Sequence, residues 1–249
     1  MFVRTASLVC ILALAAILAP SQVDAATVVR ITMIAGGSFD IELNDNTPLA
    51  RDNFLQYVNA GGYTNTIFHR SDHSINVLQG GGFALPANSN NFVDTVTTYA
   101  PVAYEADLGW SNTLGTIGAA RTSNPNSATS QWFINLANNS SIFDDAVRPG
   151  DGYTVFGRII SGLDVAQALF AEKVWDWTLV LNDPTLPMSR LPMESSYDGG
   201  RYPTNDDFLA IKSALVVSTT SLAAPVPEPA TMALLAVGGL ALLRRRGRK

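Results

Sequence analysis

The residues that most often carry catalysis are scarce in this 249-residue sequence. Its two histidines, His69 and His73, are four positions apart, which is the spacing of the zinc-protease pattern His-Glu-x-x-His. The residue after His69 is Arg70 instead of the required glutamate, and the single cysteine, Cys10, lies in an apolar N-terminal run. The sequence therefore predicts no metal site and disfavours a Ser-His-Asp hydrolase. We expect His69 to be buried and hydrogen-bonded and His73 to lie in a loop.

A group of acidic residues forms a second candidate site. Asp144, Asp145 and Asp151 lie close to Gly150 and Gly152, a composition also found in calcium-binding loops. The regular spacing of ligands that such a loop requires is missing. We therefore expect a solvated acidic turn here.

Three segments show a denser pattern of glycine, aromatic and polar residues. They are 62–70 (GYTNTIFHR) leading to 79–81 (QGG); 115–117 (GTI), 120–121 (AR) and 126–135 (NSATSQWFIN); and 143–144 (FD) with 152–157 (GYTVFG). In this order they resemble the cyclophilins, which are peptidyl-prolyl cis-trans isomerases. The resemblance spans about 28–171 and returns at 208–217. It implies a mainly β fold, a closed eight-stranded antiparallel barrel capped by two helices, which acts on X-Pro bonds of polypeptides without a metal or cofactor.

The same resemblance assigns roles to individual side chains. Arg70 is the expected catalytic donor to the prolyl nitrogen, and Gln79 is expected to orient it. The expected substrate-binding residues are Phe133 as the floor of a proline pocket, Phe143 and Val77 as its walls, Tyr153 at its rim, and Gln131, Ala120 and Arg121 along the adjoining peptide groove.

One segment departs from the family pattern. Between Arg70 and Gln79 the family has a shorter stretch with Pro-Gly-Phe, whereas this chain has SDHSINVL at 71–78. Ile75 or Asn76 stands near the place of the missing aromatic residue, which predicts a less apolar or differently shaped pocket. This change favours an alternative, a noncatalytic module that binds Pro-containing segments in an extracellular matrix. A purely structural surface protein is a third alternative, but it gives no reason for Arg70 beside Gln79.

Periodicity indicates which elements must position these residues. Apolar residues alternate over 28–33 and 39–43 around Ala35-Gly36-Gly37, which predicts a β-hairpin with one buried face. Thr47 as N-cap, Pro48 at the first helical position and Gly61 after the end predict a helix between them. The other expected elements are a strand at 153–160, a helix from 163 to about 173, a loop-like insertion at 174–207 and a strand at 208–217.

Both ends of the chain have the layout of sorting signals. Residues 1–25 combine Arg4, a short apolar run and the small-residue site Val23-Asp24-Ala25, which predicts an export signal cut by signal peptidase. After a cyclophilin-like domain at 26–217 and a linker at 218–225, residues 226–249 combine Pro227-Glu228-Pro229, a short apolar run and a basic end. This tail resembles the PEP-CTERM sorting signal, whose implied partner is an exosortase-like enzyme.

Charge and length narrow the location of the protein. The apolar run of the tail, residues 230–243, reaches about 21 Å as a helix, which is short for a bilayer. We therefore expect transient membrane attachment, with a simple tail anchor as the alternative. The formal net charge of −5 argues against nucleic-acid binding. The predicted location is the periplasm, outer envelope or extracellular matrix of a Gram-negative-type bacterium.

Overall fold

The computed structural model describes residues 26–87, 91–105, 110–182, 186 and 188–218. The predicted signal peptide, sorting signal and, except for Ser218, linker lie outside these residues. The strands are β1 (Thr27–Met33), β2 (Ser38–Leu43), β3 (Thr66–Asp72), β4 (Val77–Ala84), β5 (Asp94–Thr95), β6 (Thr116–Ala119), β7 (Trp132–Asn135), β8 (Val155–Ser161), β9 (Val174–Trp175), β10 (Leu191–Pro192) and β11 (Ile211–Ser218). The helices are α1 (Pro48–Asn59), α2 (Ser140–Phe143), α3 (Leu163–Ala171) and α4 (Thr178–Leu181), with a 3₁₀ turn at Asn205–Asp207.

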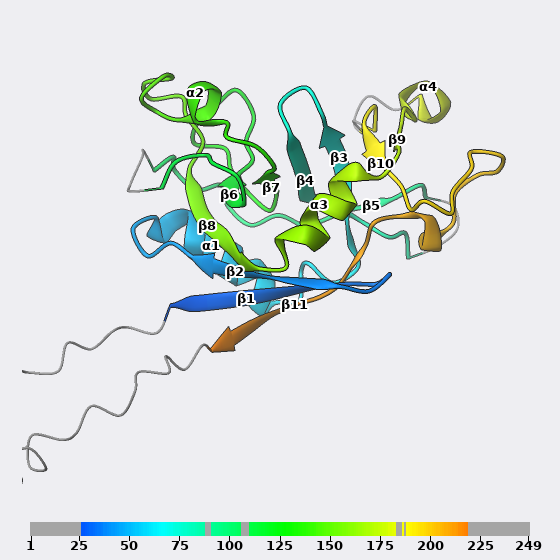
Figure 1. The fold of residues 1–249 in the computed structure, drawn as a ribbon, viewed down its shortest axis with the longest axis horizontal. Coiled ribbons are helices and arrows are strands. Elements are labelled where there is room, and N and C mark those ends of the chain that lie inside the picture. The colour runs from blue at the N-terminus through cyan, green and yellow to red at the C-terminus, as the bar shows by residue number, and fades with distance from the viewer. Residues whose placement is uncertain (1–25, 88–90, 106–109, 183–185, 187, 219–249) are drawn as a thin grey trace, which may run out of the picture. The chain divides into compact units, whose positions relative to one another are not determined.

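Most strands belong to one curled antiparallel sheet with the order β11-β1-β2-β8-β6-β7-β4-β3, and β5 pairs with β4 (Figure 1). The predicted hairpin is confirmed: β1 and β2 pair antiparallel, with Val29 opposite Ile41 and Ile31 opposite Phe39. These four side chains are fully buried. The alternating apolar residues therefore form one face of the hairpin, and this face packs into the core.

The prediction of a closed barrel is not supported, because the two edge strands meet over a short stretch. Asn65 donates a backbone hydrogen bond to Ile211 at 2.7 Å, and Phe68 donates one to Leu209 at 3.0 Å. Further along β3, the backbone N–H of Ser71 donates to the carbonyl of Arg190 at 2.8 Å instead. The chain around β10 thus occupies the edge of β3 that β11 would need in order to close the barrel, and the described strands form a half-barrel.

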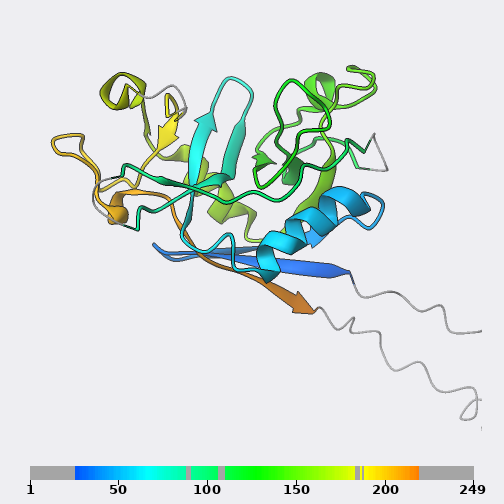
Figure 2. The ribbon, with the colours of Figure 1, turned by 180° about the vertical axis from the view of Figure 1, so that it is seen from behind.

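The two predicted helices are present as α1 and α3, which lie on opposite sides of the sheet (Figures 1 and 2). Gly61, with φ of 69°, follows α1, and Gly62 donates to Tyr57 at 2.8 Å, as expected for a glycine-terminated helix. The expected cap from the Thr47 side chain is absent. The carboxylate of Glu105 accepts from the backbone N–H groups of Leu49 and Ala50 instead, at 3.1 and 2.9 Å. The structure also has two short helices, α2 and α4.

The core that supports the candidate site is built around Trp132 of β7. Its indole ring is 1% exposed and makes edge contacts with Phe54 of α1, Tyr63 and Phe68. Gly81 has φ of 80°, and a Cβ there would lie 2.5 Å from the carbonyl oxygen of Ser130. Gly81 therefore allows β4 to approach the chain at Ser130 and Trp132 closely.

The described part of segment 174–207 contains more secondary structure than the predicted loop-like insertion, namely β9, α4, β10 and the 3₁₀ turn. Its large apolar side chains share a second core with residues of the sheet. Trp177, Met188, Leu191, Met193 and Tyr197 are buried together against Ile67 of β3, Phe83 of β4 and Phe208. The described part of the segment therefore packs against the β3–β4 hairpin.

No helix in the described ranges has both the length and the apolar character needed to cross a bilayer.

The stability of segment 174–207 should depend on pH. Arg201 donates to both carboxylate oxygens of buried Asp207, at 2.6 and 2.7 Å. These bonds, with smaller contributions from Thr204, lower the pKa of Asp207 to about 2. Because Asp207 binds a proton more readily in the unfolded chain, we expect the free energy of unfolding to fall by about 1 to 2 kcal/mol between pH 4 and pH 2, after allowing for solvent screening of the half-exposed Arg201.

Urea unfolding of the wild type and of Asp207→Asn at several pH values measures this effect. The difference in unfolding free energy between the two proteins should be largest above pH 4 and shrink toward pH 2. A difference that does not change with pH would contradict the role of the Arg201–Asp207 pair.

Candidate active site

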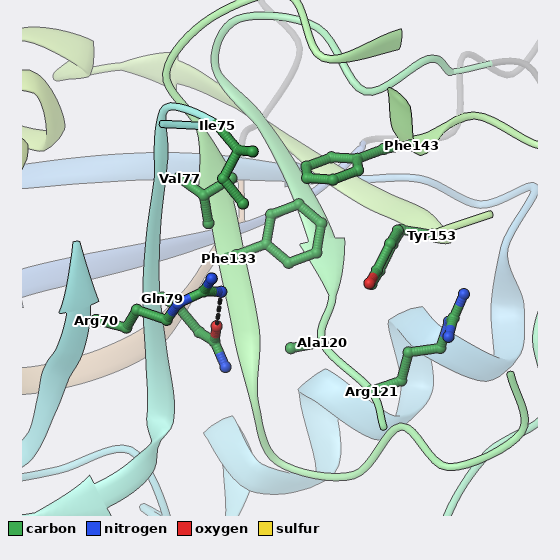
Figure 3. A pocket seen from close by; sticks show the side chains of 9 residues that line it. All are labelled: Arg70, Ile75, Val77, Gln79, Ala120, Arg121, Phe133, Phe143 and Tyr153. Carbon is green, nitrogen blue, oxygen red and sulfur yellow. Dashed lines mark hydrogen bonds between the residues drawn. The ribbon is translucent and has the colours of Figure 1, made fainter. Parts of the chain in front are cut away.

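The strand register places four sequence-distant residues in one row across the sheet. Arg70 of β3 lies opposite Gln79 of β4, Gln79 lies opposite Phe133 of β7, and Phe133 lies opposite Gly118 of β6. Directly opposed residues on neighbouring strands carry their side chains on the same face. The two predicted catalytic residues and the predicted pocket floor therefore meet on one face, as Figure 3 shows.

Aromatic side chains surround a cavity of about 160 Å³ beside this row. Phe133 packs edge-on against Phe143 and Tyr153, with ring centroids 5.7 and 5.5 Å apart. The lining residues are Arg70, Ile75, Val77, Gln79, Ala120, Arg121, Phe133, Phe143 and Tyr153. All the predicted site residues except Gln131 thus line one cavity. It is apolar at one end and carries the Arg70 guanidinium at the other.

The Arg70 guanidinium is held at two of its nitrogen atoms. Nη1 donates to Oε1 of Gln79 at 3.3 Å, and Nη2 donates to Oδ2 of Asp72 at 2.6 Å. Partial burial, with a smaller contribution from the charge of Arg190, lowers the pKa of Arg70 from its usual value. An arginine side chain is effectively always protonated, so the group remains a cation at neutral pH. A planar cation with a fixed orientation beside an apolar cavity suits a substrate that has an apolar ring next to a hydrogen-bond acceptor.

Gln131 lies next to this cavity and lines a second one. Its Oε1 accepts a hydrogen bond from Nε2 of Gln79 at 2.8 Å, which extends the polar chain that begins at Arg70. The second cavity shares Gln79, Ala120 and Arg121 with the first, and Thr122, Ser127 and Thr129 complete its lining together with Gln131. The two cavities therefore adjoin each other along Gln79, Ala120 and Arg121.

Arg121 is placed differently from the other predicted groove residues. Its side chain is 4% exposed and pairs with Asp151 at 2.6 Å. The guanidinium carbon lies 4.5 Å from the centre of the Tyr153 ring, so the side chain extends toward that ring (Figure 3). Its charge is thus engaged in fixing the segment that carries Tyr153.

Comparison with known proteins agrees with this geometry. Residues 28–186 match the family described as cyclophilin type peptidyl-prolyl cis-trans isomerase/CLD. The chain belongs to the cyclophilins. Among curated relatives of this cyclophilin, a peptidyl-prolyl cis-trans isomerase of Acinetobacter baylyi is 40% identical over 64% of the chain and 80% of the relative. Peptidyl-prolyl cis-trans isomerase A of Dickeya dadantii is 40% identical over 74% of the chain and 92% of the relative.

A solved structure shows the same fold. The cyclophilin-type peptidyl-prolyl cis-trans isomerase of Cryptosporidium parvum superposes with a TM-score of 0.51 at 21% identity, covering 78% of this chain and 98% of that one. The chain is therefore a mainly β cyclophilin with a curled antiparallel sheet and few helices. At its C-terminus, residues 225–249 match the PEP-CTERM protein-sorting motif. That motif indicates an exported protein of a Gram-negative-type bacterium that is processed by an exosortase-like enzyme.

The tip of the β3–β4 hairpin is where this cyclophilin departs from the expected pattern. Ile75 lines the cavity, whereas Asn76 adopts a positive φ of 49° and accepts a backbone hydrogen bond from Leu136 at 2.8 Å. Asn76 thus turns the hairpin and fixes its tip to the neighbouring chain. Of the two residues expected near the place of the missing aromatic side chain, Ile75 lines the cavity, and with Val77 it makes this wall aliphatic.

The other candidate residues of the sequence lie outside the pocket. His69 is buried as predicted, but its Nδ1 has no hydrogen-bond partner among the described residues. Burial, with a smaller contribution from the charge of Arg70, lowers the pKa of His69 to about 4, so the ring is neutral at neutral pH. His73 lies at the hairpin tip, where its Nε2 is 3.0 Å from the carbonyl oxygen of Phe170.

The predicted acidic turn is wrong for Asp144, which is buried. Its carboxylate accepts from the backbone and side-chain amides of Asn112 at 2.8 and 2.9 Å, since a buried carboxylate requires such partners. Asp151 is more exposed and pairs with Arg121 and Arg148. In the described ranges, no three His, Cys, Asp or Glu side chains are grouped so that they could hold a metal ion.

Two residues near Arg70 were missed from the sequence, Asp72 and Arg190. Because side chains two positions apart in a strand lie on the same face, the sequence spacing of Arg70 and Asp72 predicts this contact. No sequence pattern predicts the contact of Arg190 with Asp72, because this contact depends on how segment 174–207 packs.

Proposed function

We propose that this cyclophilin isomerises X-Pro bonds of exported or cell-surface polypeptides, with Arg70 stabilising the twisted amide. The observation that carries the proposal is the row of Arg70, Gln79 and Phe133 beside an aromatic pocket. A cation that can reach the prolyl nitrogen and a cavity that can hold the proline ring lie next to each other.

The chemistry requires few groups, because no bond is made or cleaved. Rotation about an X-Pro amide breaks its resonance, which costs about 18 to 20 kcal/mol. As the amide twists, the nitrogen lone pair becomes a better hydrogen-bond acceptor. A donor that bonds this nitrogen more strongly in the twisted state than in either planar state lowers the barrier. Arg70 is the donor in this proposal, and no nucleophile is needed.

The remaining side chains hold the substrate. Phe133 forms the floor of the proline pocket, Phe143, Val77 and Ile75 form its walls, and Tyr153 forms its rim. Gln79 orients Arg70 and is itself bonded to Gln131. Ala120, Gln131 and Arg121 border the groove for the residues before the proline, where Arg121 acts by fixing the groove wall because its charge is paired with Asp151.

The location follows from the two ends of the chain. Signal peptidase removes residues 1–25 by cleaving after Ala25. The sorting signal at 226–249 then directs the domain at 26–217 to the envelope or matrix. The PEP-CTERM match supports export and an exosortase-like partner. Signal peptidase cleavage and transient membrane attachment through the tail rest on the sequence pattern of residues 1–25 and 226–249.

NMR exchange spectroscopy on the purified protein with a set of X-Pro peptides tests the activity. Uncatalysed exchange takes tens to hundreds of seconds, so we expect cis and trans resonances of the peptide to exchange measurably faster when protein is added. Peptide binding without accelerated exchange would overturn catalysis and support the noncatalytic binding module instead.

A further inference from the structure

The Arg70 guanidinium has two partners, Gln79 and the carboxylate of Asp72. Asp72 ends β3, two residues after Arg70, and its side chain is 4% exposed. Oδ2 accepts from Nη2 of Arg70 at 2.6 Å, while Oδ1 accepts from the backbone N–H and the hydroxyl of Ser74 at 3.1 and 2.6 Å. The carboxylate is therefore fixed by the hairpin turn that follows it, and it can fix Arg70 in return.

Arg190 reaches the same carboxylate from segment 174–207. Its Nη1 forms an ion pair with Oδ1 of Asp72, and its backbone carbonyl accepts from Ser71 at 2.8 Å. The neighbouring Met188 and Leu191 are fully buried in the cluster that includes Ile67 of β3, and β10 lies beside β3 (Figure 1). Arg190 is thus held at Asp72 by the packing of its neighbours Met188 and Leu191.

The net charge of Arg70, Asp72 and Arg190 depends on both arginines being paired with the one buried carboxylate. Arg70 paired with Asp72 alone would leave this end of the pocket electrically neutral, which would weaken a donor intended for the prolyl nitrogen. Arg190 adds a second positive charge, so that the group of two arginines and one carboxylate keeps a net charge of one cation around a carboxylate that is 4% exposed. Asp72 and Gln79 meanwhile hold two nitrogens of the Arg70 guanidinium, so its orientation is set before substrate binds.

We propose that Asp72 and Arg190 are positioning residues for Arg70, and that segment 174–207 thereby supports the isomerase reaction from outside the pocket. The inference rests on the proposed function, because it assigns a role to Arg70 in catalysis. It predicts that disruption of the Asp72–Arg190 pair slows turnover while peptide binding, which depends on Phe133 and its aromatic neighbours, is retained.

The test compares Asp72→Asn, Arg190→Gln and the double variant in the purified protein. We expect kcat to fall about 10-fold in Asp72→Asn and about 5-fold in Arg190→Gln, because one charge-assisted bond near the reacting group is lost in each. The peptide Kd should change less than about 2-fold, and in the Asp72→Asn background Arg190→Gln should add less than about 2-fold, because residues that act as one unit are not additive. Arg190→Lys should recover part of the rate.

A matched control is Arg30→Gln, which removes another half-exposed, ion-paired arginine: Arg30 is 51% exposed and pairs with Asp40, and Arg190 is 44% exposed. We expect kcat of this variant to equal that of the wild type. The Nε–Hε NMR signal of Arg70, identified by its loss in Arg70→Lys, should shift or broaden in Arg190→Gln and stay unchanged in Arg30→Gln. A merely structural role of Arg190 would not change this signal.

Two results would overturn the inference alone. One is a folded Arg190→Gln protein with wild-type kcat and an unchanged Arg70 signal. The other is the same fractional loss from Arg190→Gln with and without Asp72→Asn, which would mean that Arg190 acts independently of Asp72. A wild type that binds X-Pro peptides without accelerating their exchange would instead overturn the proposed function and this inference with it.

Discussion

Replacing Arg70 with alanine is expected to lower kcat/KM by about 10- to 150-fold, because a charge-assisted hydrogen bond of about 1.5 to 3 kcal/mol is lost in the transition state. Arg70 lines the pocket and is held by Gln79 and Asp72. The peptide Kd should change far less than the rate, since the cavity formed by Phe133 and Phe143 remains. NMR exchange rates and a binding titration on the same peptide measure the two quantities.

The conservative variant Arg70→Lys separates the effect of the positive charge from that of the planar guanidinium. An ammonium group keeps the charge but cannot bond Gln79, Asp72 and the substrate in one plane, so this variant should also be slow. If Arg70→Ala exchanges cis and trans peptide as fast as the wild type, the catalytic role of Arg70 is wrong, and another group must stabilise the twisted amide.

Replacing Gly118 with alanine should weaken peptide binding, in contrast to Arg70→Ala, which mainly lowers the rate. A Cβ at Gly118 would lie 2.2 Å from Cζ of Phe133, closer than any real contact, and Phe133 is packed against Phe143 and Tyr153. The Phe133 ring must therefore shift, and because it lines the cavity that the proline ring would fill, the shape of that cavity changes. Forcing an extra methyl group into a packed site costs about 1 to 3 kcal/mol, so we expect the peptide Kd to rise about 5- to 150-fold.

Gly200→Ala serves as the control for this change. A Cβ there meets the carboxylate oxygen of Asp198 at 3.2 Å, which is the end of a flexible side chain far from the pocket in sequence. Its Kd should stay within about 2-fold of the wild type, as for most surface substitutions. Unchanged binding in a folded Gly118→Ala protein would show that the Phe133 ring does not form the floor of the occupied pocket.

The sequence alone was enough for the elements whose signals are local. The alternation over 28–33 and 39–43 predicted the β1–β2 hairpin, and Pro48 and Gly61 marked the ends of α1. The motif segments also predicted the lining of the pocket, with Gln131 in the adjoining cavity. These residues meet because they lie at fixed positions in strands, and the strand register brings them opposite one another.

The tertiary structure decided what no short window of sequence encodes. Whether the barrel closes depends on competition between β11 and the chain near β10 for the edge of β3. Segment 174–207 looked like a loop because its prolines and glycines dominate its local propensity. Its buried Trp177 and methionines form a core only against Ile67 and Phe83. The contact of Arg190 with Asp72 follows from that packing. Local propensities extend over a few residues, but burial and charge pairing are gained between residues far apart in the chain, so these features form only when the whole domain folds.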